Sequence, residues 1–189
     1  SERVRLTAGS TTSFDAGRGC PFTCSFCTII NVQGHKSRER SIESIENIIR
    51  GNVKQGLSSF FISDDDFAQN KNWESILDKF IELREVHKLK ISFTIQVDTL
   101  CHNLPGFIEK SGRAGVKRAF IGLENINPDS LLGASKRQNK ITDYRAMLLA
   151  WKKVGVITCC GYILGFPSDT QESILRDIEI IKKELPVDL

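Results

Sequence analysis

The chain has 189 residues, of which 40% are hydrophobic and 26% are charged, which is the balance of a globular domain rather than of a disordered chain. Its 26 Lys and Arg residues exceed its 23 Asp and Glu residues by only three, too few to predict binding to nucleic acid or to an anionic membrane. No apolar run approaches the ~18 residues of a membrane-spanning helix, and the first residues do not resemble a signal peptide.

Apolar periodicity predicts alternating strands and helices after a connector at residues 1–11, within one domain at residues 12–189. Strands are predicted at residues 12–16, 57–63, 89–97, 116–124 and 156–166. Helices are predicted at about 42–55, 73–81, 105–111, 142–154 and 169–185. Ser41 is a predicted N-cap, and Asp169 with Glu172 has the spacing of a capping box. Residues 186–189 would begin a sixth strand, but the sequence as given stops there.

This alternation predicts an α/β fold with a parallel sheet, either doubly wound or a β/α barrel. The stretch at 89–97 distinguishes them, because its apolar residues alternate with Lys90, Ser92, Thr94 and Gln96. A doubly wound sheet buries both faces of its strands, whereas a barrel can enclose a polar lumen. We therefore expect a partial (β/α) barrel of five to six units with outer helices, its site at the carboxyl ends of the strands.

The six cysteines are distributed unevenly, which argues against a disulfide framework and for reduced thiols in the cytoplasm. Cys101, Cys159 and Cys160 are expected to be small buried residues. The other three, Cys20, Cys24 and Cys27, fall within eight residues. Three thiolates on one loop can hold three corners of an iron–sulfur cube and leave the fourth iron open.

The spacing Cys-x3-Cys-x2-Cys, with Phe26 just before the last cysteine, resembles the radical S-adenosylmethionine (SAM) superfamily. The resemblance implies a [4Fe-4S] cluster on Cys20, Cys24 and Cys27, with SAM bound at the open iron. It also implies reductive cleavage of SAM to a 5′-deoxyadenosyl radical, which abstracts hydrogen from a small-molecule or other substrate. An electron donor such as flavodoxin or ferredoxin would then be a partner. No individual catalytic residue is assigned.

Further residues at strand ends are candidate SAM contacts. Three adjacent acids follow the strand at 57–63, where they repel one another unless a cation is near, and we favour Asp64 and Asp65 as contacts to SAM. Gln96 and Glu124 would share the polar face, although a salt bridge of Glu124 with a nearby Lys or Arg is an equal alternative. Gly161, Ile163 and Gly165 resemble the Gly-x-Ile-x-Gly adenine contact of the superfamily, since glycine lets backbone approach a flat ring.

Residues 28–34 and the Asp-Asp-Asp sequence resemble the cobalamin-binding branch, which contains methyltransferases and ring-forming enzymes. In that case a segment upstream of this chain would bind the cobalamin. Two alternatives stay open, namely an iron–sulfur electron carrier, which would need a fourth cysteine ligand, and a structural zinc or scaffold domain, which would need four protein ligands.

Overall fold

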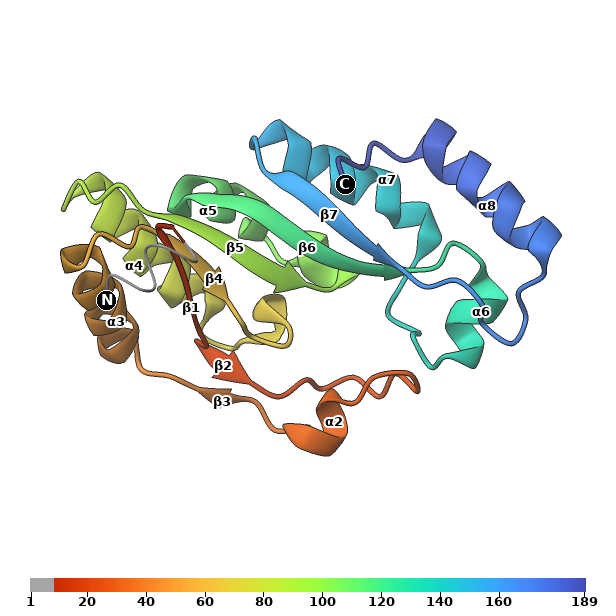
Figure 1. The fold of residues 1–189 in the computed structure, drawn as a ribbon, viewed down its shortest axis with the longest axis horizontal. Coiled ribbons are helices and arrows are strands. Elements are labelled where there is room, and N and C mark those ends of the chain that lie inside the picture. Colours follow the sequence, from red (N-terminus) through yellow and green to blue (C-terminus); the bar gives the residue numbers. More distant parts are fainter. Residues whose placement is uncertain (1–8) are drawn as a thin grey trace.

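A computed structural model describes residues 9–189, and its main feature is a five-stranded parallel sheet in the order β1-β4-β5-β6-β7 (Figure 1). The strands are β1 (Thr11–Phe14), β4 (Ser59–Ile62), β5 (Ser92–Val97), β6 (Val116–Glu124) and β7 (Ile157–Tyr162). Most of the connector predicted at residues 1–11 lies outside the described residues.

Helices follow the strands and cover one face of the sheet (Figure 1). They are α3 (Ile42–Lys54), α4 (Trp73–Glu85), α5 (Phe107–Ala114), α7 (Ile141–Lys153) and the last helix, α8 (Gln171–Glu184). The core forms where α3, α4, α5 and α7 meet the sheet, and it includes the stacked rings of Phe80 and Phe93, whose centroids are 4.0 Å apart. The alternation of strand and helix therefore produces the predicted α/β architecture.

The opposite face of the sheet is the more polar one. Along β5, Phe93, Ile95 and Val97 are buried in the core, while Ser92, Thr94 and Gln96 are only partly buried. Two similar faces would have indicated a doubly wound sheet, so the observed asymmetry agrees with the predicted partial barrel and its polar lumen.

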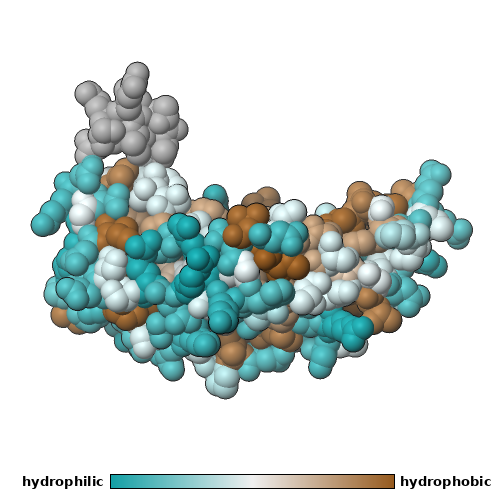
Figure 2. Space-filling view, turned by 90° about the horizontal axis from the view of Figure 1, so that it is seen from below, coloured by the Kyte–Doolittle hydropathy of each residue, from teal (hydrophilic) through white to brown (hydrophobic). Residues whose placement is uncertain are grey.

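Several short elements were not predicted. They are the strand pair β2 (Gly17–Arg18) and β3 (Arg38–Glu39), the helices α2 (Ile29–Val32) and α6 (Pro128–Gly133), and the 3-10 turns η1 (Phe67–Gln69) and η2 (Thr99–Asn103). Figure 2 looks onto the side of the molecule that carries β2, β3 and α2 and shows hydrophilic and apolar residues intermixed there. These elements are too short for periodicity to reveal them.

Several predicted boundaries were wrong; β5 begins at Ser92 rather than at residue 89, and α5 spans Phe107–Ala114 rather than 105–111. The last strand ends at Tyr162 rather than at residue 166, because the chain turns at Gly165, whose φ is +90°. The capping box of α8 is formed by Thr170 and Ser173 rather than by Asp169 and Glu172. Ser41 does cap α3 as predicted, since its side chain accepts a hydrogen bond from Ser44 N.

The last residues of the chain run beside β7. Leu189 N donates to Thr158 O at 3.1 Å, and Leu189 O accepts from Cys160 N at 2.8 Å. This is the hydrogen-bond pattern of a parallel neighbour, in line with a sixth strand beginning at 186–189. In the part of the chain that is described, no helix combines the length and the apolar character needed to cross a membrane.

Candidate functional site

A cavity lies at the carboxyl ends of β4, β5 and β6, beneath the loop that carries the three clustered cysteines. It encloses about 640 Å³, including space open to solvent. The cysteine loop supplies one side, and polar residues from the strand ends supply the other. Its polar and sulfur-bearing lining residues are Cys20, Cys24, Cys27, Asp65, Asp66, Gln96, Asp98, Glu124, Lys136 and Gln138.

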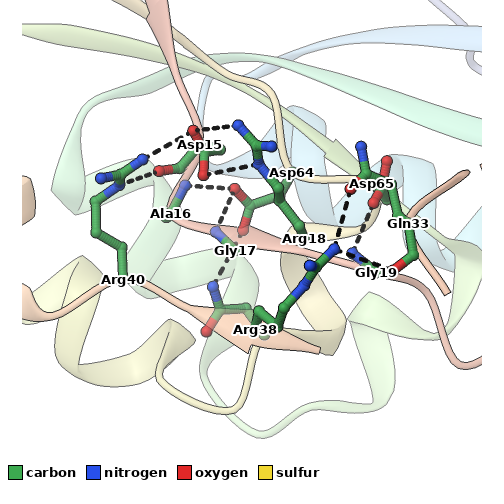
Figure 3. Close-up of polar contacts among 11 residues, drawn as sticks. Asp15, Ala16, Gly17, Arg18, Gly19, Gln33, Arg38, Arg40, Asp64 and Asp65 are labelled. Carbon is green, nitrogen blue, oxygen red and sulfur yellow. Dashed lines mark hydrogen bonds and ion pairs between the residues drawn. The ribbon is translucent and has the colours of Figure 1, made fainter. Parts of the chain in front are cut away.

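Asp64 and Asp65 fix the backbone that leads into the cysteine loop (Figure 3). The Asp64 carboxylate accepts hydrogen bonds from Ala16 N at 2.6 Å and Gly17 N at 2.8 Å. Asp65 accepts one from Gly19 N at 2.8 Å. Asp64 is 2% exposed and does not line the cavity, whereas Asp65 does. Of the two acids favoured as SAM contacts, Asp65 therefore faces the cavity, whereas the carboxylate of Asp64 is bound to backbone N–H groups.

Gly19 lets the cysteine loop pass close to the segment before β3. Its φ is +98°, and a Cβ at this position would lie 2.5 Å from Lys36 O, so no larger residue fits without moving the backbone. On the other side of the loop, Ser25 N donates to Ala134 O at 3.0 Å. The loop is thus held just before Cys20, through Gly19, and between Cys24 and Cys27, through Ser25, which limits the positions that its three sulfur atoms can take.

Asp66 and Asp98 form a buried pair of acids in the cavity wall. Asp98 N donates to Asp66 Oδ1 at 3.3 Å, and Gln69 Nε2 donates to Asp98 Oδ2 at 3.1 Å. Burial and the nearby charge of Asp98 hold the pKa of Asp66 well above its usual range, and burial also raises the pKa of Asp98. Two acids so placed favour a shared proton or a bound cation.

Glu124 ends β6 and points at Lys136 across the cavity wall, with Oε1 and Nζ 3.0 Å apart. The residue adopts a left-handed backbone conformation, with φ at +63°, at a point where the register of β6 against β7 shifts. Burial lowers the pKa of Lys136, but the Glu124 carboxylate outweighs that effect, and the net pKa is raised. The salt bridge anticipated as an alternative for Glu124 is therefore present, in a residue that also lines the cavity.

The remaining predicted residues divide into two groups. Gln96 lines the cavity and donates to Asp64 O at 3.1 Å. Gly161, Ile163 and Gly165 are not among the residues that line it. A Cβ on Gly161 would lie 3.3 Å from the ring of Phe120, which does line the cavity, so this glycine lies beside a residue of the cavity wall.

Lys136 and Gln138 line the cavity but were not expected there, and Asp66 was part of the predicted acidic run without being one of its two favoured acids. Lys136 and Gln138 belong to a polar segment between α6 and α7 that has no periodicity. The only signal in the sequence was the basic stretch that begins at Lys136.

The cysteine sulfurs suit a cluster better than a single metal ion. All three thiols are free and line one cavity. Burial raises the pKa of Cys20 to about 11, with the charges of Asp66, Cys24 and Cys27 adding to the effect, so a thiolate at Cys20 needs a cationic partner. Within residues 9–189, no three His, Cys, Asp or Glu side chains converge as ligands of one ion. A structural zinc ion needs four protein ligands, whereas a [4Fe-4S] cluster binds each cysteine through a different iron atom, so three cysteines fit it.

Comparison with known proteins places these features in a family. The family model of the Radical SAM superfamily matches residues 15–181. The bacteriochlorophyllide d C-12(1)-methyltransferase of Chlorobaculum tepidum is 28% identical over 179 residues, which cover 91% of this chain and 38% of that protein.

Two solved structures share the fold. One is the radical S-adenosylmethionine methyltransferase TsrM from Kitasatospora setae with tryptophan substrate and a SAM analogue bound, with a TM-score of 0.83 and 18% identity over 96% of this chain and 35% of that chain. The other is the cobalamin-dependent S-adenosylmethionine radical enzyme OxsB with aqua-cobalamin bound. Its TM-score is 0.71, and its 18% identity extends over 93% of this chain and 27% of that chain.

The chain thus spans little more than a third of the length of the curated relative. Members of the superfamily use a [4Fe-4S] cluster and SAM, and the solved neighbours have the partial-barrel fold. The family match covers the cysteine loop, all the strand ends around the cavity and the segment from α6 to α7. The chain belongs to the radical SAM superfamily.

Proposed function

We propose that this chain is the catalytic core of a cobalamin-dependent radical SAM methyltransferase. The observation that carries the proposal is the cavity between Cys20, Cys24 and Cys27 on one side and strand-end carboxylates on the other. When bound there, the cluster and SAM supply a 5′-deoxyadenosyl radical that abstracts hydrogen from a substrate. Relatives named as methyltransferases or methylases, which include the C-12(1) enzyme and a hopanoid C-2 methylase of Rhodopseudomonas palustris, support methyl transfer over ring formation.

The chain's own residues would bind and orient SAM. The ammonium and sulfonium of SAM are cationic, and Asp65, Asp66 and Asp98 present carboxyl groups to the cavity. A cation bound beside Asp66 and Asp98 would offset the mutual repulsion of the pair. Asp65 can accept a second hydrogen bond beyond the one from Gly19, since a carboxylate has several acceptor sites.

Phe120 supports a place for a flat ring in the lumen. Its side chain is 45% exposed, lines the cavity and packs over Gly161. Gly161, which lies beside Phe120, would contact adenine through its backbone together with Ile163 and Gly165. The ion pair of Glu124 with Lys136 offers one acceptor and one donor to the ribose or to the carboxylate of SAM.

A flavodoxin or ferredoxin would supply the electron, a small molecule would be the substrate, and a segment outside this chain would bind cobalamin. A cytoplasmic location fits six cysteines that are all free.

The test is spectroscopic. The protein, reconstituted with iron and sulfide without oxygen and then reduced, should give a cluster signal in electron paramagnetic resonance (EPR) that changes when SAM is added. A cluster signal that SAM leaves unchanged would support the electron carrier instead. Reconstitution that yields bound zinc and no iron would support the structural zinc domain.

A further inference from the structure

The segment between α6 and α7 ties the cysteine loop to the end of β6, and we call residues 134–139 the clamp. Four of its residues make the contacts. Ala134 O accepts a hydrogen bond from Ser25 N at 3.0 Å, and Lys136 Nζ lies 5.9 Å from the ring centroid of Phe26. Gln138 Nε2 donates to Cys24 Sγ at 3.6 Å. Asn139 Nδ2 donates to Gly122 O at 3.0 Å and to Leu123 O at 2.8 Å, at the end of β6.

Buried side-chain bonds anchor the chain on both sides of Gln138. Before it, Lys136 is fixed by the ion pair with Glu124, in which the side chains are 9% and 14% exposed. After it, Asn139 bonds β6 and also donates to the hydroxyl of Tyr144 at 2.9 Å. The backbone on both sides of Gln138 is therefore anchored, and its amide lies within hydrogen-bond distance of Cys24 Sγ.

The sulfur that receives this hydrogen bond is well shielded from water. Cys24 is 6% exposed, while Cys20 and Cys27 are more accessible. A donor has a larger electrostatic effect in such surroundings, because the local dielectric constant is low. Of the three cysteine sulfurs, Cys24 Sγ is the one to which the structure assigns a side-chain donor within residues 9–189.

Hydrogen bonds to the cysteine sulfurs and nearby charge set the reduction potential of an iron–sulfur cluster. Reduction adds one negative charge, so an N–H donor and a cation stabilise the reduced form more than the oxidised form. Asp65, Asp66 and Asp98 line the same cavity and act in the opposite direction.

We propose that Gln138, held by the clamp, raises the reduction potential of the cluster on Cys20, Cys24 and Cys27 by donating its amide hydrogen bond to Cys24 Sγ. The proposal rests on the proposed function, since it requires a cluster at these cysteines. Gln138 is a positioning residue in this account, because it acts on the cluster through a ligand.

The test is a redox titration of the reconstituted cluster, followed by EPR, for variants that grade the donor at this position. Gln138→Met keeps the length but removes the donor, Gln138→Glu also adds a negative charge, and Gln138→Lys keeps a donor and adds a positive charge. From highest to lowest midpoint potential, the expected order is Gln138→Lys at or above wild type, then Gln138→Met, then Gln138→Glu. For Gln138→Met we expect about a tenfold smaller equilibrium constant of reduction, which is about 59 mV for one electron. Gln171→Met makes the same change on an exposed residue of α8 and should leave the midpoint unchanged.

The outcomes separate this proposal from the proposed function. A wild-type protein that takes up no redox-active cluster would overturn both. If the wild-type cluster and all three Gln138 variants have the same midpoint potential, the effect of Gln138 on the potential is overturned, while the proposed function stands. Lower iron content without an ordered shift would show a purely structural role for Gln138 and would also contradict the proposal.

Discussion

Glu124 and Lys136 form an ion pair of 3.0 Å in the wall of the cavity that the three clustered cysteines line. Gly122 makes room for it, because a Cβ there would lie 2.5 Å from Glu124 Oε1 and 3.2 Å from Lys136 Nζ. Nearby charges of Cys24 and Asp66 also favour the protonated lysine. Lys136 Nζ also lies 5.9 Å from the ring centroid of Phe26, so the pair links the end of β6 to the cysteine loop.

Replacing Lys136 by Met should destabilise the protein, because it leaves the Glu124 carboxylate buried without its partner. The expected loss in free energy of unfolding is about 3 kcal/mol, since breaking a buried pair costs more than the pair itself contributes. Chemical denaturation followed by circular dichroism measures this loss. In the double variant Glu124→Gln with Lys136→Met, most of the stability should return.

Lys182 offers a matched control on α8. It pairs with Glu179 at 2.9 Å, but the two side chains are 65% and 60% exposed. Lys182→Met should therefore change the free energy of unfolding by less than about 1 kcal/mol. Equal losses for Lys136→Met and Lys182→Met would contradict the buried character of the Glu124 pair.

Asp64 and Asp65 should separate into a structural and a binding role. Asp64→Ala leaves the N–H groups of Ala16 and Gly17 without their acceptor, so the free energy of unfolding should fall by about 3 kcal/mol. Asp65→Ala removes a single bond, to Gly19, and should cost about 1 kcal/mol while weakening SAM binding. Thermal unfolding measures the first effect, and titration of the cluster signal with SAM measures the second. Loss of SAM binding in a stable Asp64→Ala protein would reverse this assignment.

Asp66→Asn should stabilise the protein without its cofactors, increasingly so as the pH rises. The folded-state pKa of Asp66 lies well above that of an unfolded Asp, because of burial and the charge of Asp98. Between the unfolded and the folded pKa, the folded state binds more protons, so stability falls as the pH rises through this window. Asn cannot ionise and keeps the Oδ1 acceptor for Ala68 N and Asp98 N.

The measurement is the free energy of unfolding of Asp66→Asn relative to wild type from pH 4 to pH 8, and the difference should grow across that range. Asp129→Asn, which changes an exposed carboxylate at the start of α6, should show no such trend. A constant difference between Asp66→Asn and wild type would mean that the wild-type carboxyl does not titrate in this window.

Local signals in the sequence were sufficient for most of the framework. The alternation at residues 89–97 predicted both β5 and its polar face, and Ser41 marked the start of α3. The cysteine spacing predicted a metal-binding loop without tertiary information, and the structure places its three cysteines in the wall of one cavity. The end of β7 could not be predicted, because the turn at Gly165 follows an apolar sequence that continues past Tyr162.

The composition of the cavity wall was harder to predict because it depends on turns. Alternation along a strand stops at its end, so it could not tell which of the acids at 64, 65 and 66 enters the cavity. The chain turns into η1 there, which directs Asp64 toward Ala16 and Gly17, while Asp65 and Asp66 line the cavity. Lys136 and Gln138 reach the site from an aperiodic segment, and only the three-dimensional path of that segment brings them to the cysteine loop.

The most direct test of the central claim compares Cys24→Ala with Cys101→Ala. Cys24 lines the cavity, whereas Cys101 is fully buried in the core. Both proteins, reconstituted and reduced without oxygen, are assayed for bound iron and sulfide and for 5′-deoxyadenosine released from SAM. Cys24→Ala should release no 5′-deoxyadenosine, whereas Cys101→Ala should keep the wild-type cluster content and release 5′-deoxyadenosine. Release of 5′-deoxyadenosine by Cys24→Ala at the wild-type level would contradict the assignment of the cluster to Cys20, Cys24 and Cys27.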